Sequence, residues 1–293
     1  MRTKRDERHE RAGRAGHVRR AGRDAEGPRD DGGGGPGAGP GRPGAGEGGR
    51  PVVAVGHRGD PYRIRENTLA SLRSALARGA DAVEFDVRLT RDGVPVLLHD
   101  ATLERLWEDE RRLADLTLAE VREHTRGGVP TLAEALAALP GARLMIDLPG
   151  ASAAAVRTVV GTVRDGGAAE RVYYCASPTA MLAVRAADAD AEIAMTWTTV
   201  APPRPTLLDA VRPRWLNYRF GLVSAELAER NHRDGLLVSA WTVDTARSMR
   251  RLVARGVDSI TTNRIDVLAA LLGPAARPAA RPVSPPTPHL EQP

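Results

Sequence analysis

Cysteine is scarce in this chain and long apolar runs are missing from it, and each lack excludes a class of protein or site. Cys175 is the only cysteine among 293 residues, which excludes an internal disulfide, and no group of Cys and His has zinc-site spacing. No apolar run approaches the roughly 18 residues that a membrane span needs, and the N-terminus lacks the apolar stretch of a signal peptide. We therefore expect a cytoplasmic protein without an integral membrane segment.

The net charge of +5 comes from the two ends of the chain rather than from its middle. Residues 1–50 contribute +4 and residues 274–293 contribute +1, so the stretch between them is neutral. Lys4 is the only lysine, and arginine carries nearly all of the other positive charge. A basic pI that belongs to the ends is poor evidence for a nucleic-acid surface on a folded domain. We expect no nucleic-acid partner, and the sequence indicates no protein partner.

Composition divides the chain into three parts. Residues 1–50 cannot bury enough apolar area to offset the entropy of ordering, so we expect a disordered basic tail rich in Gly, Pro and Arg. Residues 274–293 are expected to form a Pro-rich disordered tail. Residues 51–273 are predicted to fold, and their length suits a (β/α)8 barrel, or TIM barrel.

Short apolar runs alternate with helical patterns across the predicted domain. Apolar strands separated by helices are typical of a parallel sheet that is covered on both faces. Eight such units predict a closed α/β TIM barrel, and an open, doubly wound sheet is the alternative. The expected strands are 52–56, 82–88, 143–148, 171–175, 192–197, 214–218, 236–241 and 257–262. The expected helices are 67–78, 131–138, 152–165, 178–187, 223–234, 244–255 and 265–272, with at most a short helix in 201–212.

The second expected strand is followed by a hairpin extension instead of a helix. Between strand 82–88 and His99 the sequence stays apolar, interrupted by Asp92-Gly93, a strong turn signal. We predict that this strand runs past the barrel rim, turns and returns, so that His99 lies beside the acids of the strand. Residues 101–130 would then form a small insertion before the next helix.

Two histidines and an arginine end these strands. His57 and Arg58 follow the first strand, at the place where barrel enzymes position their chemistry. Histidine can act as a general acid or base near neutral pH, and arginine offers a planar fork for phosphate oxygens. His99 ends the returning strand near the same rim. We take His57 and His99 as the candidate catalytic pair; a structural role at a strand end is the alternative for each.

Three acids are expected to face the barrel axis. Glu84 and Asp86 alternate with Phe85, which suits the helix layer, and Asp147 ends the strand at 143–148. Buried carboxylates repel one another unless a cation lies between them. Ligands that are all oxygen favour Mg²⁺ or Ca²⁺ over Zn²⁺. The sequence therefore predicts one divalent cation, Mg²⁺ or Ca²⁺, at these acids; a solvent-facing pair on a twisted extension is the alternative for Glu84 and Asp86.

These residues lie in segments that resemble the glycerophosphodiester phosphodiesterase family. The segments run in order across about 52–266, nearly the whole predicted domain. They are HRG at 57–59, ENTLASLRSAL at 66–76, GADAVEFDVRLTRDGVPVLLHDATLER at 79–105, PTLAEAL at 130–136, WTVDT at 241–245 and GVDSITTNR at 256–264.

The resemblance implies metal-dependent hydrolysis of a small glycerophosphodiester to glycerol 3-phosphate and an alcohol. It implies that the two histidines share the acid and base work, that the three acids hold the metal, and that Arg58 binds the phosphate. Glu66 would line the same site. Trp241 would lie beside the glycerol of the substrate, with an ordinary packing role as the alternative.

The sequence departs from the family pattern at three places. Where the family usually reads I-E-x-K, this chain has Asp147 and Pro149, so the carboxylate is one methylene shorter and a phosphate-binding lysine is missing. No other lysine lies in the predicted domain, so only an arginine could replace it. The other departures are Leu106-Trp107-Glu108 after Arg105 and Asn263-Arg264-Ile265 in place of Asp-Arg-Pro. A lysophospholipase C- or D-like phosphodiesterase and a non-catalytic phosphoester-binding protein stay open as alternatives.

Overall fold

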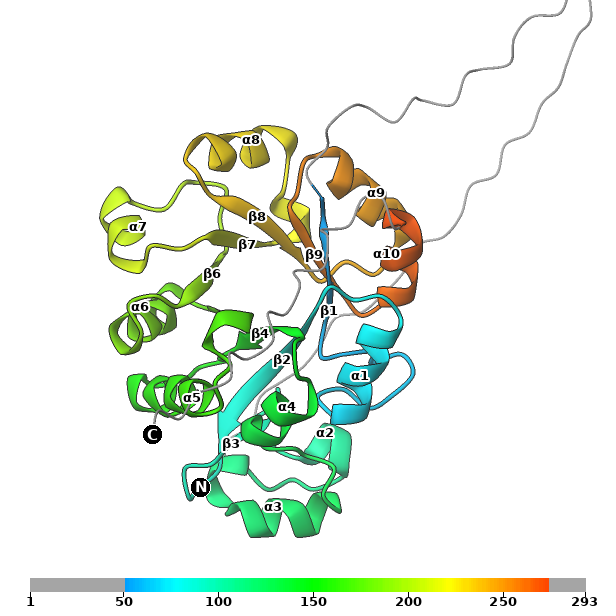
Figure 1. Cartoon of the computed structure of the whole chain (residues 1–293), viewed down its shortest axis with the longest axis vertical. Helices are drawn as coiled ribbons and strands as arrows, with labels where there is room; N and C mark the ends of the chain where they lie inside the picture. Colours follow the sequence, from blue (N-terminus) through cyan, green and yellow to red (C-terminus); the bar gives the residue numbers. More distant parts are fainter. Residues whose placement is uncertain (1–50, 274–293) are drawn as a thin grey trace, which may run out of the picture. The chain divides into compact units, whose positions relative to one another are not determined.

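A computed structural model describes residues 51–273, which form a closed barrel of parallel strands surrounded by helices (Figure 1). The strand order is β1-β9-β8-β7-β6-β5-β4-β2, and β1 also pairs with β2, which closes the ring. This closure confirms the predicted TIM barrel and excludes the open sheet. The barrel strands are β1 (Val53–Gly56), β2 (Ala82–Leu89), β4 (Arg143–Asp147), β5 (Val172–Ala176), β6 (Glu192–Trp197), β7 (Trp215–Arg219), β8 (Leu237–Trp241) and β9 (Ser259–Thr262).

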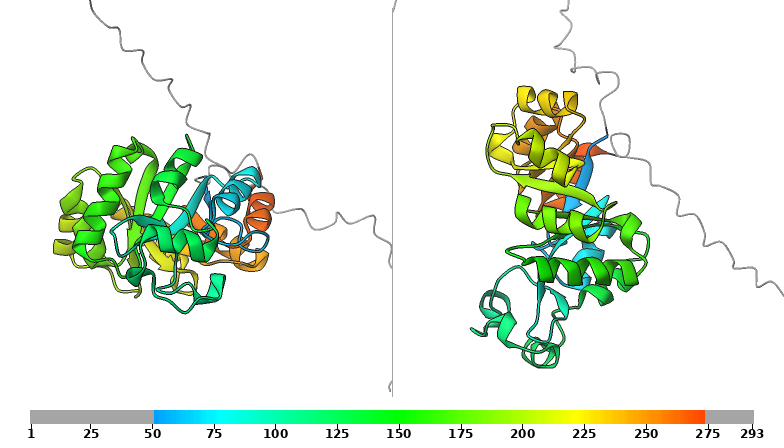
Figure 2. Two further views of the ribbon diagram at one scale, coloured as in Figure 1. Left: turned by 90° about the horizontal axis from the view of Figure 1, so that it is seen from below. Right: turned by 90° about the vertical axis from the view of Figure 1, so that its left-hand side faces the viewer.

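The helices lie on the outside of the barrel, as the three views in Figures 1 and 2 show. Most begin at a Ser or Thr whose side chain accepts a backbone N–H of the first turn, which satisfies a donor that the helix itself leaves unpaired. Every expected strand and helix within the described range is found within two residues of its predicted bounds. The helices between strands are α1 (Leu69–Ala77), α4 (Leu132–Ala138), α5 (Ala153–Asp165), α6 (Pro178–Ala187), the short α7 (Pro205–Val211), α8 (Ala225–Arg233) and α9 (Ala246–Ala254), with α10 (Ile265–Leu272) after the last strand.

The predicted hairpin extension is also confirmed. Strand β3 (Pro95–Leu97) runs antiparallel to β2, with Val87 opposite Leu97. Gly93 supplies the positive φ of the turn, and the Thr90 hydroxyl accepts the backbone N–H of Val94. The expected insertion follows, and it contains α2 (Glu104–Trp107), η1 (Leu113–Asp115) and α3 (Leu118–Thr125). It has an apolar core of its own, made of Val96, Leu98, Leu103, Leu113, Leu116, Val121 and Val129.

Apolar side chains fill two concentric layers. The larger layer lies between the strands and the helices and includes Phe85, which is fully buried there. The inner layer lies inside the barrel and consists of Val55, Ala82, Met145, Tyr173, Cys175, Ala194 and Trp215. Because side chains alternate along β2, the placement of Ala82 inside and Phe85 outside directs Glu84 and Asp86 toward the barrel axis, as the sequence predicts.

Two further expectations concern the ends of the chain and membrane-spanning segments. The expected tails at 1–50 and 274–293 lie outside the described residues. Within 51–273, no helix is long and apolar enough to cross a membrane.

Candidate active site

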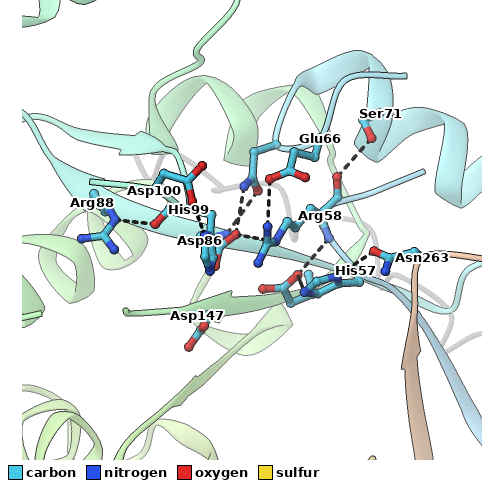
Figure 3. Close-up of polar contacts among 12 residues, drawn as sticks. His57, Arg58, Glu66, Ser71, Asp86, Arg88, His99, Asp100, Asp147 and Asn263 are labelled. Carbon is cyan, nitrogen blue, oxygen red and sulfur yellow. Dashed lines mark hydrogen bonds and ion pairs between the residues drawn. The ribbon is translucent and has the colours of Figure 1, made fainter. Parts of the chain in front are cut away.

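Polar side chains from β1, β2, β3 and β4 gather at the carboxyl ends of the barrel strands (Figure 3). His57 and Arg58 follow β1, Asp86 lies on β2, Asp147 is the last residue of β4, and His99 follows β3. The returning strand is held beside β2 because Leu98 N donates to the carbonyl oxygen of Asp86. Residues that lie far apart in the sequence therefore converge on one end of the barrel.

The three acids form one compact cluster. Each of Glu84, Asp86 and Asp147 offers a carboxylate oxygen, and these oxygens lie within 4.8 Å of one another. Asp86 and Asp147 are direct neighbours in the parallel pairing of β2 and β4. Glu84 and Asp86 are only 4% and 1% exposed. The structure thus brings together the carboxylates predicted as metal ligands.

Burial and mutual repulsion change the proton affinity of this cluster. Burial, together with the charges of Asp86 and Asp147, raises the pKa of Glu84 well above its ordinary value. Burial and the charge of Asp86 raise the pKa of Asp147 to about 7. Without a positive charge between them, these carboxylates cannot all be ionised at low cost near neutral pH.

The donor set fits a hard divalent cation. One oxygen of each acid accepts a protein hydrogen bond: Glu84 Oε2 from Arg58 N, Asp86 Oδ2 from Asn67 Nδ2, and Asp147 Oδ1 from Leu148 N. Within residues 51–273, no protein hydrogen bond reaches the other oxygen of any of the three. Three carboxylates with oxygens within 4.8 Å of one another suit Mg²⁺ or Ca²⁺, which prefer oxygen ligands.

Arg58 lies between the acids and Glu66. Its Nε is 3.1 Å from Asp86 Oδ2, and its Nη1 donates to Glu66 Oε1 at 2.9 Å. The backbone of Arg58 is left-handed, and Gly59 follows in a conformation where a Cβ would overlap Ser71 of α1. Gly59 is therefore needed for this turn to pack against α1, and the turn leaves Arg58 beside the acids.

Both ring nitrogens of His57 have a side-chain oxygen nearby. Nδ1 lies 2.7 Å from Oδ1 of Asn263, and Nε2 lies 3.9 Å from Oε2 of Glu84. Burial and the neighbouring charge of Arg58 lower the pKa of His57, which favours the neutral ring near pH 7. Asn263 follows β9, so the two ends of the barrel sequence meet at this histidine.

His99 has a charged partner instead. Its Nδ1 lies 2.7 Å from Oδ1 of Asp100, and Asp100 in turn accepts from Arg105 Nε at 2.6 Å. Although burial opposes it, hydrogen bonds from His99 and Arg105 hold the pKa of Asp100 below its ordinary value. Arg105 also donates to Glu66, so Glu66 contacts two arginines. This network links His99 to Arg58.

Trp241 is the last residue of β8 and is half-buried. Its indole Nε1 is buried and has no acceptor within the described range. Thr261 on the neighbouring strand has a buried hydroxyl that is also without a partner there.

Sequence reasoning missed several residues that the structure places around the site. Asn67 exchanges two hydrogen bonds with Asp86, and its left-handed backbone is one that asparagine tolerates better than most residues. Asp100 and Arg105 hold His99, and Asn263 holds His57. All four carried a signal, because each lies in a segment that resembles the family: Asn67 in 66–76, Asp100 and Arg105 in 79–105, and Asn263 in 256–264.

Comparisons with known proteins agree on one family. Residues 57–267 match the model of the glycerophosphoryl diester phosphodiesterase family. The chain is 26% identical over 242 residues to the glycerophosphodiester phosphodiesterase of Caldanaerobacter subterraneus subsp. tengcongensis, which covers 75% of this chain and 98% of the relative. It is 30% identical over 243 residues to "Probable glycerophosphodiester phosphodiesterase 2" of Mycobacterium tuberculosis, covering 75% and 90%.

Solved structures of the same fold include relatives of this kind. The glycerophosphodiester phosphodiesterase from Agrobacterium tumefaciens matches with a TM-score of 0.65 and 25% identity, covering 75% of this chain and 98% of that one. An Oleispira antarctica phosphodiesterase, solved in complex with the product sn-glycerol-3-phosphate, matches with a TM-score of 0.68 and 19% identity, covering 76% and 97%. At that identity the second likeness shows the fold alone.

Proposed function

The chain belongs to the glycerophosphoryl diester phosphodiesterase family, and we propose that it hydrolyses small glycerophosphodiesters to glycerol 3-phosphate and an alcohol at the site formed by His57, His99 and the three acids. The observation that carries this proposal is the convergence of two histidines, an arginine and a compact carboxylate cluster at the catalytic end of a TIM barrel. The Oleispira antarctica phosphodiesterase, a barrel of the same fold, binds the product that this reaction would yield.

Glu84, Asp86 and Asp147 would hold one divalent cation, Mg²⁺ or Ca²⁺. When bound, such a cation supplies positive charge to a phosphoryl oxygen as negative charge grows in the transition state. The raised pKa values of Glu84 and Asp147 support this assignment, because a cation would relieve the repulsion that causes them. Asn67 and Arg58 fix the orientation of Asp86 and leave its second oxygen available.

The two histidines would carry the proton transfers. Each has its Nδ1 engaged by a neighbouring oxygen, which leaves Nε2 as the atom that exchanges a proton. One ring would remove a proton from the attacking hydroxyl, of water or of the substrate glycerol, and the other would protonate the departing alcohol.

Arginines would bind the phosphate in the absence of the family lysine. Arg58 lies beside the acids, with Glu66 orienting its guanidinium. Arg88 lies two residues beyond Asp86 on the same face of β2, and its Nε donates to the carbonyl oxygen of His99 at 2.6 Å. The charges of both arginines favour the ionised form of Asp147. Trp241, half-buried at the end of β8, would lie beside the glycerol.

A lysophospholipid is a poorer fit than a small diester. The leucines and valines of the 101–130 insertion that could form an apolar rim are packed into its own core. The side chains that face outward there include Arg105, Asp109 and Arg111, which form ion pairs. We therefore favour a water-soluble diester over a lipid substrate.

The substrate class can be tested by comparing turnover of glycerophosphocholine, glycerophosphoethanolamine and lysophosphatidylcholine by the full chain with Mg²⁺ or Ca²⁺. We expect both glycerophosphodiesters to yield glycerol 3-phosphate with a higher kcat/KM than the lysophospholipid. A higher kcat/KM for the lysophospholipid would favour the lipase-like alternative. Binding of all three without turnover would favour a non-catalytic role.

A further inference from the structure

Asn263, which contacts His57, is itself held by Asp244. Asp244 follows β8 and precedes α9, and Asn263 follows β9. Oδ1 of Asp244 accepts the backbone N–H of Asn263 at 2.9 Å and the Thr262 hydroxyl at 3.2 Å. Oδ2 of Asp244 lies 2.9 Å from the side-chain nitrogen of Asn263.

This arrangement decides which way the Asn263 amide points. An ionised carboxylate can only accept hydrogen bonds, whereas an amide has a donating NH₂ end and an accepting oxygen end. The NH₂ end of Asn263 must therefore face Asp244, and Oδ1 must face His57. A reversed amide would place its oxygen against the carboxylate and its NH₂ against the ring.

The orientation of Asn263 in turn decides where the proton of His57 lies. The ring nitrogen at 2.7 Å from Asn263 Oδ1 is Nδ1, and an amide oxygen can only accept, so Nδ1 must carry the hydrogen. A neutral imidazole has one N–H and one lone pair. Nε2, the nitrogen that faces Glu84 and the site, therefore has the lone pair.

We propose that Asp244 and Asn263 are positioning residues that fix the Nδ1–H tautomer of His57, so that the neutral ring can accept a proton only at Nε2. The inference rests on the proposed function for its kinetic consequence, but the tautomer itself is independent of turnover. Asn263 contacts His57, and Asp244 contacts Asn263. Asp244 acts through Asn263, and Asn263 acts through the ring.

The variant Asp244→Asn tests the chain of reasoning with little change in shape. Its new amide would use Oδ1 for the backbone N–H of Asn263, so its NH₂ would face the Asn263 side chain. Asn263 would then turn its oxygen toward residue 244 and its NH₂ toward His57. The ring could match that donor only with a lone pair on Nδ1 and a proton on Nε2, which is the wrong tautomer for a base.

Exchanging the two residues should restore a hydrogen-bond acceptor facing Nδ1 of His57. In the double variant Asp244→Asn with Asn263→Asp, the amide at 244 still accepts the backbone N–H of residue 263 and now donates to its carboxylate. That carboxylate again offers His57 an acceptor. The double variant should therefore recover most of the kcat that the single variant loses, which a merely structural role would not predict.

We expect Asp244→Asn to lower kcat on the order of 10²-fold or more while KM changes little, as for loss of a general acid or base. Each variant is compared at the plateau of its own pH–rate profile. Thr245→Ala is the matched control, because it removes the side chain that caps α9 next to Asp244 but leaves the pair intact. It should keep most of its kcat. A single variant as active as wild type, or a double variant no better than the single one, would overturn the proposal.

The tautomer can also be read without any substrate. Nitrogen-15 NMR of the histidine rings, with His57 assigned by comparison with His57→Gln, should show the Nδ1–H form in the wild-type chain and the Nε2–H form in Asp244→Asn. An Nε2–H ring in wild type would overturn the tautomer assignment even if the chain proves highly active. The expected NMR result without turnover would refute the proposed function and keep the assignment.

Discussion

Asp147→Asn in the absence of divalent cations tests the electrostatics of the acidic cluster. Burial and the charge of Asp86 raise the pKa of Asp147 from an ordinary 3.8 to about 7 in the folded chain. A carboxyl whose pKa is raised by folding stabilises the protein while it is protonated. That stability is present at low pH and is lost as the pH rises toward 7. In EDTA, the wild-type chain should therefore become less stable between pH 5 and pH 7 relative to Asp147→Asn, which cannot ionise.

The size of the effect follows from the same pKa. Over this range the folded state holds a proton that the unfolded state does not, and each pH unit is then worth about 1.4 kcal/mol. The stability of wild type relative to Asp147→Asn should fall by roughly 2–3 kcal/mol from pH 5 to pH 7. The substitution also removes one of the charges that raise the pKa of Glu84, which acts in the same direction.

Urea unfolding of both proteins at the two pH values measures this difference, and a cation provides the control. Mg²⁺ or Ca²⁺ at about 100 times its Kd should stabilise wild type by about 2.7 kcal/mol at pH 7 and stabilise Asp147→Asn much less. The reasoning fails if the gap between the proteins is the same at both pH values, or if wild type gains relative stability as the pH rises.

Three further predictions concern the catalytic pair, the glycerol side of the site and the domain boundary. His57→Ala and His99→Ala should each lower kcat by about 10²- to 10⁴-fold with cation affinity retained. A nitrophenyl phosphodiester should restore activity to whichever variant lacks the general acid. A variant that keeps nearly all of its kcat for glycerophosphocholine, and shows no dependence on the leaving group, would contradict the two-histidine mechanism. Trp241→Ala should raise KM for glycerophosphocholine, because it removes the half-buried ring that would lie beside the glycerol, and an unchanged KM would leave Trp241 a packing residue. A chain that starts near Gly49 should fold and turn over substrate like the full chain, and a large loss of folded protein or activity would show that residues 1–50 are needed.

The barrel and its carboxylates could be predicted from the sequence because both depend on local patterns. Alternation around Phe85 directs Glu84 and Asp86 inward, and the Asp92-Gly93 turn returns the chain to His99. Each inference needs only a strand, its periodicity and a turn signal. Thr117 and Glu120 form a capping box, a similarly local signal that marks the start of α3 inside the insertion.

The partners of the two histidines could not be predicted, because they depend on where loops meet in space. Asn263 lies 206 residues from His57 in the sequence, and only closure of the barrel between β1 and β9 brings them together. The orientation of the Asn263 amide depends further on Asp244, which lies on a third loop. Such contacts follow from the packing of strand ends, and no periodicity encodes them.

The most direct test of cation-dependent hydrolysis at this site is a phosphorus-31 NMR time course of glycerophosphocholine with the metal-free full chain. We predict no conversion before Mg²⁺ or Ca²⁺ is added, replacement of the diester signal by that of glycerol 3-phosphate afterwards, and arrest of the reaction when EDTA is added in excess. Conversion at the same rate before the cation, with it and after EDTA would contradict the account.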